Sequence, residues 1–255
     1  MSQSDVVLYS VEGSAARITL NRPEKRNALN DAVIAGLKQN LKKAAADKNV
    51  RVIVISGAGK DFCSGADLSA LQKIAGASVA QNSEDARSLL ELFLLIRAIQ
   101  IPVVAAVTGR ALAGGCGLAT ACDLVVASAS SRFGYPEVKI GFVPAMVLAI
   151  LRRNVSEKRA FELIARGAEI SAEQAKEFGL VNQVFADESF ETDVRLYVSE
   201  FEKMSAPAMG LTKTLLYQMD GLAFPEALET GADVNVIARL TDDCRQKVAK
   251  FLQKD

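Results

Sequence analysis

The chain has 255 residues, half of them hydrophobic, and its 30 lysines and arginines balance 30 aspartates and glutamates, so the formal net charge is zero. This composition argues against a disordered chain and against a general electrostatic attraction to nucleic acid or anionic membranes. The sequence contains no histidine. Ser–His and Cys–His nucleophile pairs are therefore excluded, and proton transfer falls to carboxylates, lysine, tyrosine or cysteine.

The N-terminal half alternates strand-like and helix-like segments. Residues 6–11 and 16–20 are short and β-branched, and the intervening turn residues predict a hairpin. Apolar residues at helical spacing predict a helix over 30–46, with Asn30 or Asp31 as its N-cap. A strand at 50–55 follows.

The same alternation continues in the middle of the chain. The spacing predicts a helix over 84–99 and mostly apolar strands at 101–107 and 123–127. A repeating order of strand, crossover helix and parallel strand indicates an α/β fold.

The C-terminal part is mainly helical. From about residue 144 only 181–185 is strand-like, and the chain from 188 onward predicts four helices, with breaks near Pro207 and at 221–225. This final part has no sheet of its own, so we expect it to pack on the core or on another subunit.

Targeting and metal-binding patterns are not found in the sequence. The four cysteines, Cys63, Cys116, Cys122 and Cys244, form no C-x-x-C pair and do not predict a zinc site. The first residues lack the charged and apolar regions of a signal peptide, and no apolar run approaches the ~20 residues needed to cross a bilayer. We expect a cytoplasmic protein with free cysteines.

Two glycine-containing turns, at 62–68 and 109–118, each follow a strand-like segment and precede a helix-like one. Backbone N–H groups at a helix N-terminus have no helical partner, and small residues let a ligand oxygen approach them. Two such turns facing one carbonyl would form an oxyanion hole. The alternative is that the glycines only allow tight turns and close packing.

A third segment, 133–144, contains a glutamate, Glu137, among proline, aromatic and aliphatic residues. Desolvation by such neighbours raises the pKa of a carboxyl, which suits a group that must both accept and donate a proton. The alternative is a solvent-facing glutamate in a loop.

Four motifs in order resemble the crotonase superfamily, the enoyl-CoA hydratase/isomerase group, over nearly the whole chain. They lie at 21–29, 54–68, 109–117 with 121–123, and 133–144. The resemblance implies an α/β fold with a crotonase-like ββα spiral core that binds acyl-CoA, over residues 1–190. It also implies a C-terminal helical trimerisation region over 191–255, giving a homotrimer or a dimer of trimers.

The resemblance also implies roles for particular residues. The backbone N–H groups of Ala66 and Gly114 would hold the thioester oxygen, and Glu137 would be the catalytic acid/base. The segments expected to bind CoA contribute Lys25, Arg26, Ala28, Ala66, Asp67, Leu68 and Gly114. CoA is part of the substrate, so no separate cofactor, metal, nucleic acid or membrane partner is expected. The alternative to CoA binding is that Lys25 and Arg26 simply lie in a solvent-exposed turn.

The sequence departs from the two-glutamate pattern of family hydratases at Gly117, where that pattern has its first glutamate; only Glu137 is retained. One carboxylate suffices either for hydration on one face of the double bond or for a 1,3-proton shift. Met146 and Val147 replace glycines of the family's P-G-x-G-G run and should reshape the acyl pocket. Gly117, the retained Glu137 and the pair Pro144–Ala145 are together similar to bacterial methylglutaconyl-CoA hydratases, which implies a short branched acyl group.

Three functions therefore remain open. The first is an enoyl-CoA hydratase acting on a short 2-enoyl-CoA, straight or branched, and the second is a 3-enoyl-CoA to 2-enoyl-CoA isomerase. The third is a weakly catalytic protein that binds CoA or RNA. For a substrate carboxylate the nearest cations in sequence are Arg110 and Lys139, whose alternative role is simple solvation. Three carboxylates of the second long helix are candidates to assist Glu137: Glu84, Asp85 and Glu91.

Overall fold

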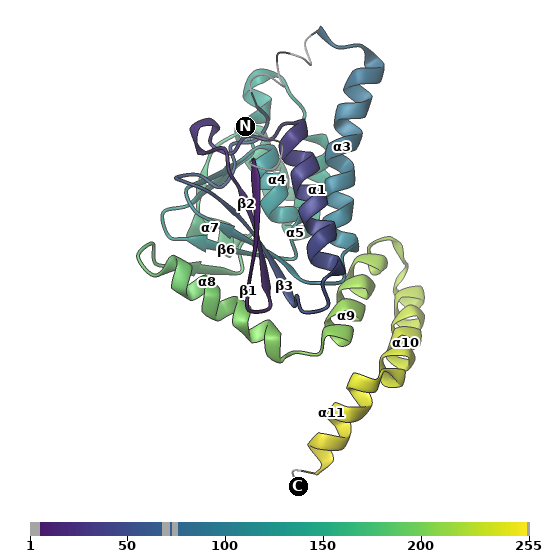
Figure 1. Ribbon diagram of the computed structural model, residues 1–255. Helices are drawn as coiled ribbons and strands as arrows, with labels where there is room; N and C mark the ends of the chain where they lie inside the picture. Colours follow the sequence, from purple (N-terminus) through teal and green to yellow (C-terminus); the bar gives the residue numbers. More distant parts are fainter. Residues whose placement is uncertain (1–5, 68–71, 73–75, 254–255) are drawn as a thin grey trace.

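The computed structural model describes residues 6–67, 72 and 76–253, and its centre is a six-stranded sheet (Figure 1). The strand order is β1-β2-β3-β4-β6-β9. The strands are β1 (Val7–Glu12), β2 (Ala15–Leu20), β3 (Val52–Gly57), β4 (Val103–Val107), β6 (Leu124–Ser128) and β9 (Gln183–Phe185).

The predicted hairpin and the predicted parallel strands are both confirmed. β1 and β2 pair antiparallel through a turn at Gly13, whose φ of 60° suits glycine. All further neighbours in the sheet are parallel. Parallel pairing requires a crossover between strands, and helices supply it here.

A second, three-stranded sheet lies beside the first. It contains β5 (Arg110–Leu112), β7 (Arg132–Gly134) and β8 (Ile170–Ser171), in the order β5-β7-β8. The sequence does not predict these strands because two or three residues are too short to show an alternating pattern. Their importance is positional, since they link the second glycine turn to the glutamate segment.

Helices α1 (Asp31–Ala46), α3 (Val79–Ala98) and α4 (Gly114–Ala121) cover one face of the large sheet. The prediction for α1 is confirmed, and Asn30 caps it by accepting a hydrogen bond from the Val33 N–H at 3.0 Å. α3 begins before the predicted residue 84, because Ser78 and Gln81 form a reciprocal capping box.

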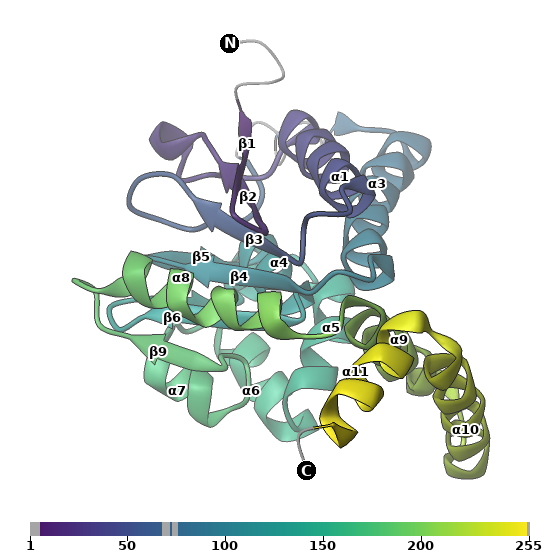
Figure 2. The ribbon, with the colours of Figure 1, turned by 60° about the horizontal axis from the view of Figure 1, so that its bottom comes forward.

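The opposite face of the sheet is covered by α8 (Phe190–Ser199), as Figure 2 shows. Val194 and Val198 of this helix pack with Val52 and Val54, whereas the alternate residues Ile53 and Ile55 belong to the core on the α1 side. Because successive strand residues point to opposite faces, the sheet is buried on both sides. α8 therefore packs on the core, although most of it lies within the predicted region 191–255.

The remaining helices surround the end of the core or leave it. α5 (Ala145–Asn154), α6 (Glu157–Arg166) and α7 (Ala172–Glu177) follow the glutamate segment. The C-terminal helices are α9 (Ala206–Gln218), α10 (Phe224–Leu240) and α11 (Asp242–Leu252).

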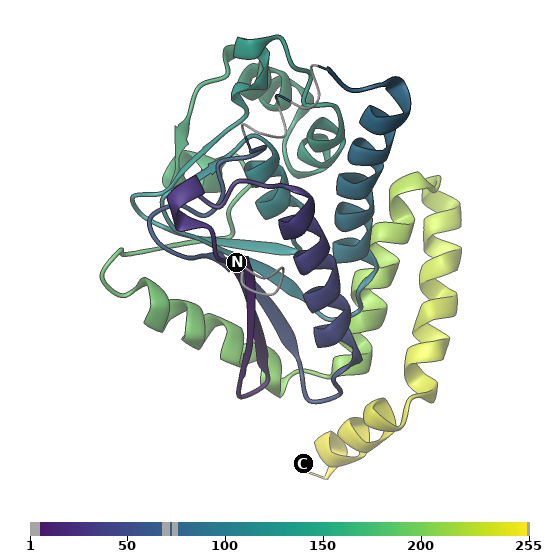
Figure 3. The same ribbon diagram turned by 45° about the horizontal axis from the view of Figure 1, so that its top comes forward.

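α10 and α11 extend away from the sheet and its covering helices (Figure 3). Neither helix has a buried residue in this single chain, although both carry large apolar side chains with more than half of their surface exposed. The described residues contain no helix of the length and apolarity that crossing a membrane requires.

Candidate functional site

The first glycine turn is bonded on one side to the segment that precedes α1. The Leu29 N–H donates to the Gly65 carbonyl at 2.7 Å, and the Asp67 N–H donates to the Leu29 carbonyl at 2.9 Å. Successive peptide groups of an extended chain point in opposite directions, so the Ala66 N–H points away from Leu29. This N–H has no acceptor among the described residues, and Ala66 is exposed.

The other side of this turn lies against the start of α4. A Cβ built on Gly65, which has a φ of 95°, would lie 2.7 Å from the Ala113 Cβ and 3.4 Å from the Gly114 nitrogen. Gly114 is the first residue of α4, and its N–H also has no acceptor in the described part of the chain. The two N–H groups predicted to bind the thioester oxygen thus belong to segments in direct contact.

Gly114 and Gly115 have different roles in the packing. A Cβ on Gly115 would lie 2.3 Å from the Cys63 carbonyl oxygen, so this position requires glycine. A Cβ on Gly114 would meet only the Leu29 Cδ1, at an ordinary 3.6 Å. The open space at Gly114 is therefore not a requirement of the fold, and a ligand atom can occupy it.

The small sheet brings the glutamate segment against α4. β7 ends at Gly134, whose carbonyl accepts the Ala113 N–H at 2.8 Å. The next residue, Tyr135, is buried, and its hydroxyl lies 3.2 Å from the Thr120 hydroxyl on α4. Glu137 then lies in a 3₁₀ turn, Pro136–Ile140, held close to α4 by these two contacts.

Glu137 is half-buried, and its Oε2 atom is buried without a hydrogen-bond partner. No other carboxylate oxygen of the described residues is both buried and without a hydrogen-bond partner. Burial raises the pKa of Glu137, and a hydrogen bond from its own backbone N–H opposes the rise. A buried carboxylate without a partner is costly to fold and is available to exchange a proton with a ligand or water.

Gly117, where the resemblance leads us to look for a first glutamate, is buried one turn after Gly114. A Cβ built there would lie 2.2 Å from the Val147 Cγ1 of α5. A side chain at 117 is therefore excluded unless Val147 moves.

The residues predicted to bind CoA lie around the first turn. Lys25 and Arg26 are exposed, whereas Ala28 and Asp67 are buried. Leu68 lies outside the described residues. The turn at Lys25–Arg26 thus presents two cations next to the Ala66 segment, because the Arg26 carbonyl accepts the Ser64 N–H at 3.0 Å.

Two residues that organise this region were not singled out from the sequence. The Arg22 guanidinium donates to the Ala28 carbonyl at 2.8 Å and forms an ion pair with Asp67 at 2.7 Å. Asn27 is fully buried, has a φ of 54°, and donates to the Asp61 carbonyl at 2.7 Å. Their only signal is their place in the motif at 21–29, because neither belongs to a periodic pattern.

The other candidate carboxylates lie on the exposed face of α3. Glu84, Asp85 and Glu91 are all exposed, and Glu91 forms an ion pair with Lys38 of α1 at 2.9 Å. Their exposure is typical of a solvated helix face.

The candidate cations for a substrate carboxylate have other neighbours. Arg110 forms an ion pair with Glu169 at 3.3 Å. The methylene chain of Lys139 lies beside Gly167 at the C-terminus of α6, 3.1 Å from the position of a Cβ there. Arg110 is thus already paired with a carboxylate.

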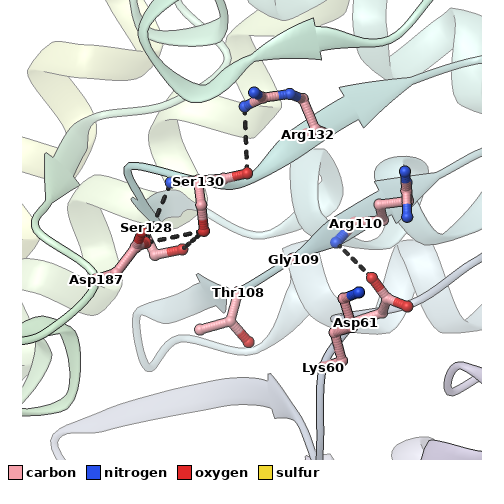
Figure 4. Close-up of a pocket in the computed structure, with 9 residues that line it drawn as sticks. All are labelled: Lys60, Asp61, Thr108, Gly109, Arg110, Ser128, Ser130, Arg132 and Asp187. Carbon is pink, nitrogen blue, oxygen red and sulfur yellow. Dashed lines mark hydrogen bonds between the residues drawn. The ribbon is translucent and has the colours of Figure 1, made fainter.

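A separate pocket of about 550 Å³ lies at the carboxyl ends of the parallel strands (Figure 4). Its polar groups bind one another: Asp61 accepts the Arg110 N–H at 3.0 Å, and Asp187 accepts the Ser130 hydroxyl at 2.9 Å. It contains none of the predicted catalytic residues. The pocket is lined by Lys60, Asp61, Thr108, Gly109, Arg110, Ser128, Ser130, Arg132 and Asp187.

The chain is similar to known proteins over most of its length. Residues 10–255 match the family model described as enoyl-CoA hydratase/isomerase. The chain is 36% identical to the 2,3-dehydroadipyl-CoA hydratase of Escherichia coli K12, over 93% of this chain and 91% of that protein. It is 32% identical to the mitochondrial enoyl-CoA hydratase domain-containing protein 3 of Danio rerio, over 98% and 86%.

A solved enoyl-CoA hydratase from Mycobacterium smegmatis superimposes on the chain with a TM-score of 0.93 at 30% identity, covering 98% of this chain and 97% of that one. The match therefore extends through the spiral core and the C-terminal helices. The chain belongs to the enoyl-CoA hydratase/isomerase family.

Proposed function

We propose that this protein is an enoyl-CoA hydratase that adds water across the double bond of a short 2-enoyl-CoA, with Glu137 as its acid/base. The observation that carries the proposal is the buried, unpartnered Oε2 of Glu137, which lies three residues after Gly134, whose carbonyl accepts the N–H of Ala113 directly before Gly114. Proton exchange and charge stabilisation are thereby available side by side, without histidine or metal ligands.

The proposed reaction uses one carboxylate for both proton transfers. The water oxygen forms a bond to C3 while Glu137 accepts a proton from that water, and the electrons of the double bond move toward the thioester oxygen. The N–H groups of Ala66 and Gly114 stabilise this oxygen, a contribution of about 2.7–4 kcal/mol for each donor. Glu137 then returns a proton to C2, which restores the carboxylate and completes the 3-hydroxyacyl-CoA.

In the proposed complex, CoA lies along the first turn. Lys25 and Arg26 neutralise its phosphates, and the pantetheine and adenine pass Ala28, Ala66, Asp67 and Leu68. The ion pair of Asp67 with Arg22 supports this proposal, because it holds the two segments of the turn together at 2.7 Å.

We infer in addition that the protein forms a homotrimer or a dimer of trimers. Support comes from α10 and α11, which leave the core and have no buried residue. Their large exposed apolar side chains are Phe224, Leu228, Val236, Ile237, Leu240, Val248, Phe251 and Leu252. Large exposed apolar side chains on helices that leave the core are typical of an interface between subunits.

A second reaction, the shift of a double bond from the 3- to the 2-position, is favoured by one observation. Val147 occupies the space of a side chain at 117, so a second carboxylate is missing there. A proton shift needs only one base, which removes a proton from C2 and returns it to C4.

The two reactions are distinguished by the ultraviolet absorbance of the conjugated thioester. We expect crotonyl-CoA, a four-carbon 2-enoyl-CoA, to lose this absorbance as water adds. The 3-enoyl ester should show no comparable gain. A gain with the 3-enoyl ester, and no loss with crotonyl-CoA, would identify an isomerase. CoA binding with neither change would identify a protein that only binds the ligand.

A branched acyl group is included in the proposal, because Gly117, the retained Glu137 and the pair Pro144–Ala145 resemble bacterial methylglutaconyl-CoA hydratases. A methylglutaconyl-CoA-like substrate is tested by adding that thioester to the same assay. Faster consumption of this thioester than of crotonyl-CoA would support the branched substrate. Faster consumption of crotonyl-CoA would support a straight-chain substrate.

A further inference from the structure

Gly117 and Val147 share one space. A Cβ on Gly117 would lie 2.2 Å from the Val147 Cγ1 and 3.1 Å from the Val147 Cβ, and real Cβ atoms do not approach other atoms at the first of these distances. Val147 is only 4% exposed. The Phe93 side chain lies 3.6 Å from the same position and limits movement on that side. The isopropyl group of Val147 therefore fills the volume that a side chain at 117 would need.

This space lies next to the reacting atoms of the proposed reaction. Residues three apart on a helix share a face, so position 117 lies one turn, about 5 Å, along α4 from Gly114. Gly114 carries the free N–H, and the carbonyl of Gly134, three residues before Glu137, accepts the N–H of the adjacent Ala113 at 2.8 Å. An acyl chain whose thioester oxygen binds the Gly114 N–H passes this face of α4.

From this geometry we propose that Val147 determines specificity by forming an aliphatic wall beside the reacting carbons, which limits the bulk of the acyl group and fills the space that a second carboxylate at position 117 would need. The proposal rests on the proposed hydratase function. It assigns Val147 a substrate contact and Gly117 the role of making room for that contact.

The shared space is tested first without any substrate. Gly117→Ala should lower the melting temperature of the wild-type protein, because the new methyl group collides with Val147. The same change should have little effect in a Val147→Gly background, where the isopropyl group is absent. Equal losses in both backgrounds would overturn the proposal, because the two positions would then be independent.

The specificity is tested with two substrates. For Val147→Gly we expect the ratio of kcat/KM for a methyl-branched 2-enoyl-CoA to that for crotonyl-CoA to rise about tenfold. The matched control is Val155→Gly, which removes the same group from the buried valine that follows α5. An unchanged ratio in Val147→Gly, or an equal rise in the control, would overturn the assignment.

A third variant asks whether the wall excludes a carboxylate. Gly117→Glu combined with Val147→Gly should melt at a higher temperature than Gly117→Glu alone and add a second ionisation to the pH profile of kcat/KM. If none of the proteins hydrates a 2-enoyl-CoA, and the wild type is inactive as well, the proposed function is contradicted instead. In that case the effect of Gly117→Ala on the melting temperature, compared between the wild-type and Val147→Gly backgrounds, would still show whether the two positions share one space.

Discussion

Two effects oppose each other at Glu137: burying its negative charge is costly, and catalysis needs that charge. Desolvation raises its pKa above the ordinary value of 4.5. Accepting a proton from water requires the carboxylate, so activity is lost as the pH falls through this raised pKa. We expect the acid limb of kcat/KM to lie above pH 4.5. A limb at or below pH 4.5 would show that the group controlling the rate is not desolvated.

The raised pKa of Glu137 also predicts how the stability of the protein depends on pH. A carboxyl with a raised folded-state pKa contributes stability below the unfolded-state pKa, and that contribution is lost as the pH rises through the folded-state value. Glu137→Gln, which removes the charge, should therefore melt at a higher temperature than the wild type at pH 7. Near pH 4 the difference should shrink. A lower melting temperature of the variant at pH 7 would indicate a stabilising partner for Glu137.

The two neighbouring glycines of α4 allow packing and catalysis to be tested separately. Gly115→Ala should destabilise the protein by about 1–3 kcal/mol, because its methyl group would lie 2.3 Å from the Cys63 carbonyl oxygen. Gly114→Val should fold but lose turnover, since the side chain occupies the place of the thioester oxygen. Denaturant unfolding and hydration assays measure both effects. Full turnover in a folded Gly114→Val protein would contradict the oxyanion assignment.

At the scale of elements, α9 is joined to the sheet by a buried ion pair. Lys213 donates to the Ile96 carbonyl at 2.8 Å and contacts an Asp123 carboxylate oxygen at 2.6 Å, and Tyr217 donates to the other oxygen at 2.7 Å. Burial lowers the pKa of Lys213, and the negative charge of Asp123 opposes this. Because the Val103 N–H donates to the same Asp123 carboxylate at 2.7 Å, the pair links the first C-terminal helix to the starts of β4 and β6.

Removing one member of this pair leaves a buried charge without its partner. We expect Lys213→Met to reduce the free energy of unfolding by about 3–5 kcal/mol. The exposed Lys203→Met is a control that should change it little. Chemical denaturation measures both, and a loss below about 1 kcal/mol for Lys213→Met would mean that apolar packing alone holds α9.

The long elements could be predicted from the sequence because their apolar residues recur over several turns or strand pairs. Residues 30–46 and the hairpin show this pattern clearly. The three strands of the small sheet could not be predicted, although β7 is what carries Glu137 to α4. Their residues are paired by contacts distant in sequence, which a local pattern does not contain.

The candidate site could be predicted in its parts but not in its contacts. Ala66, Gly114 and Glu137 were found through motifs, and their roles stay predictions. The replacement of a glutamate by Gly117 was visible, but its physical reason was not. Only the position of α5 reveals that Val147, thirty residues later, takes up the space.

At the scale of the whole molecule, the exposed apolar side chains of α10 and α11 predict self-association. We expect sedimentation to give about three or six times the chain mass of 27.2 kDa. Ile237 and Leu240 are 51% and 60% exposed in the single chain, so Ile237→Glu with Leu240→Glu should lower this mass without unfolding the core. A wild-type protein of 27.2 kDa in solution would contradict the trimer.

The central claim is that Glu137 exchanges the protons of hydration, and one comparison of rates tests it most directly. The initial rate of crotonyl-CoA hydration is measured for wild type, Glu137→Gln and the control Glu173→Gln, which changes an exposed carboxylate on α7. Acid/base catalysis predicts that kcat falls about 10²–10⁴-fold in Glu137→Gln and is unchanged in the control. A folded Glu137→Gln protein that keeps the wild-type kcat would contradict the account.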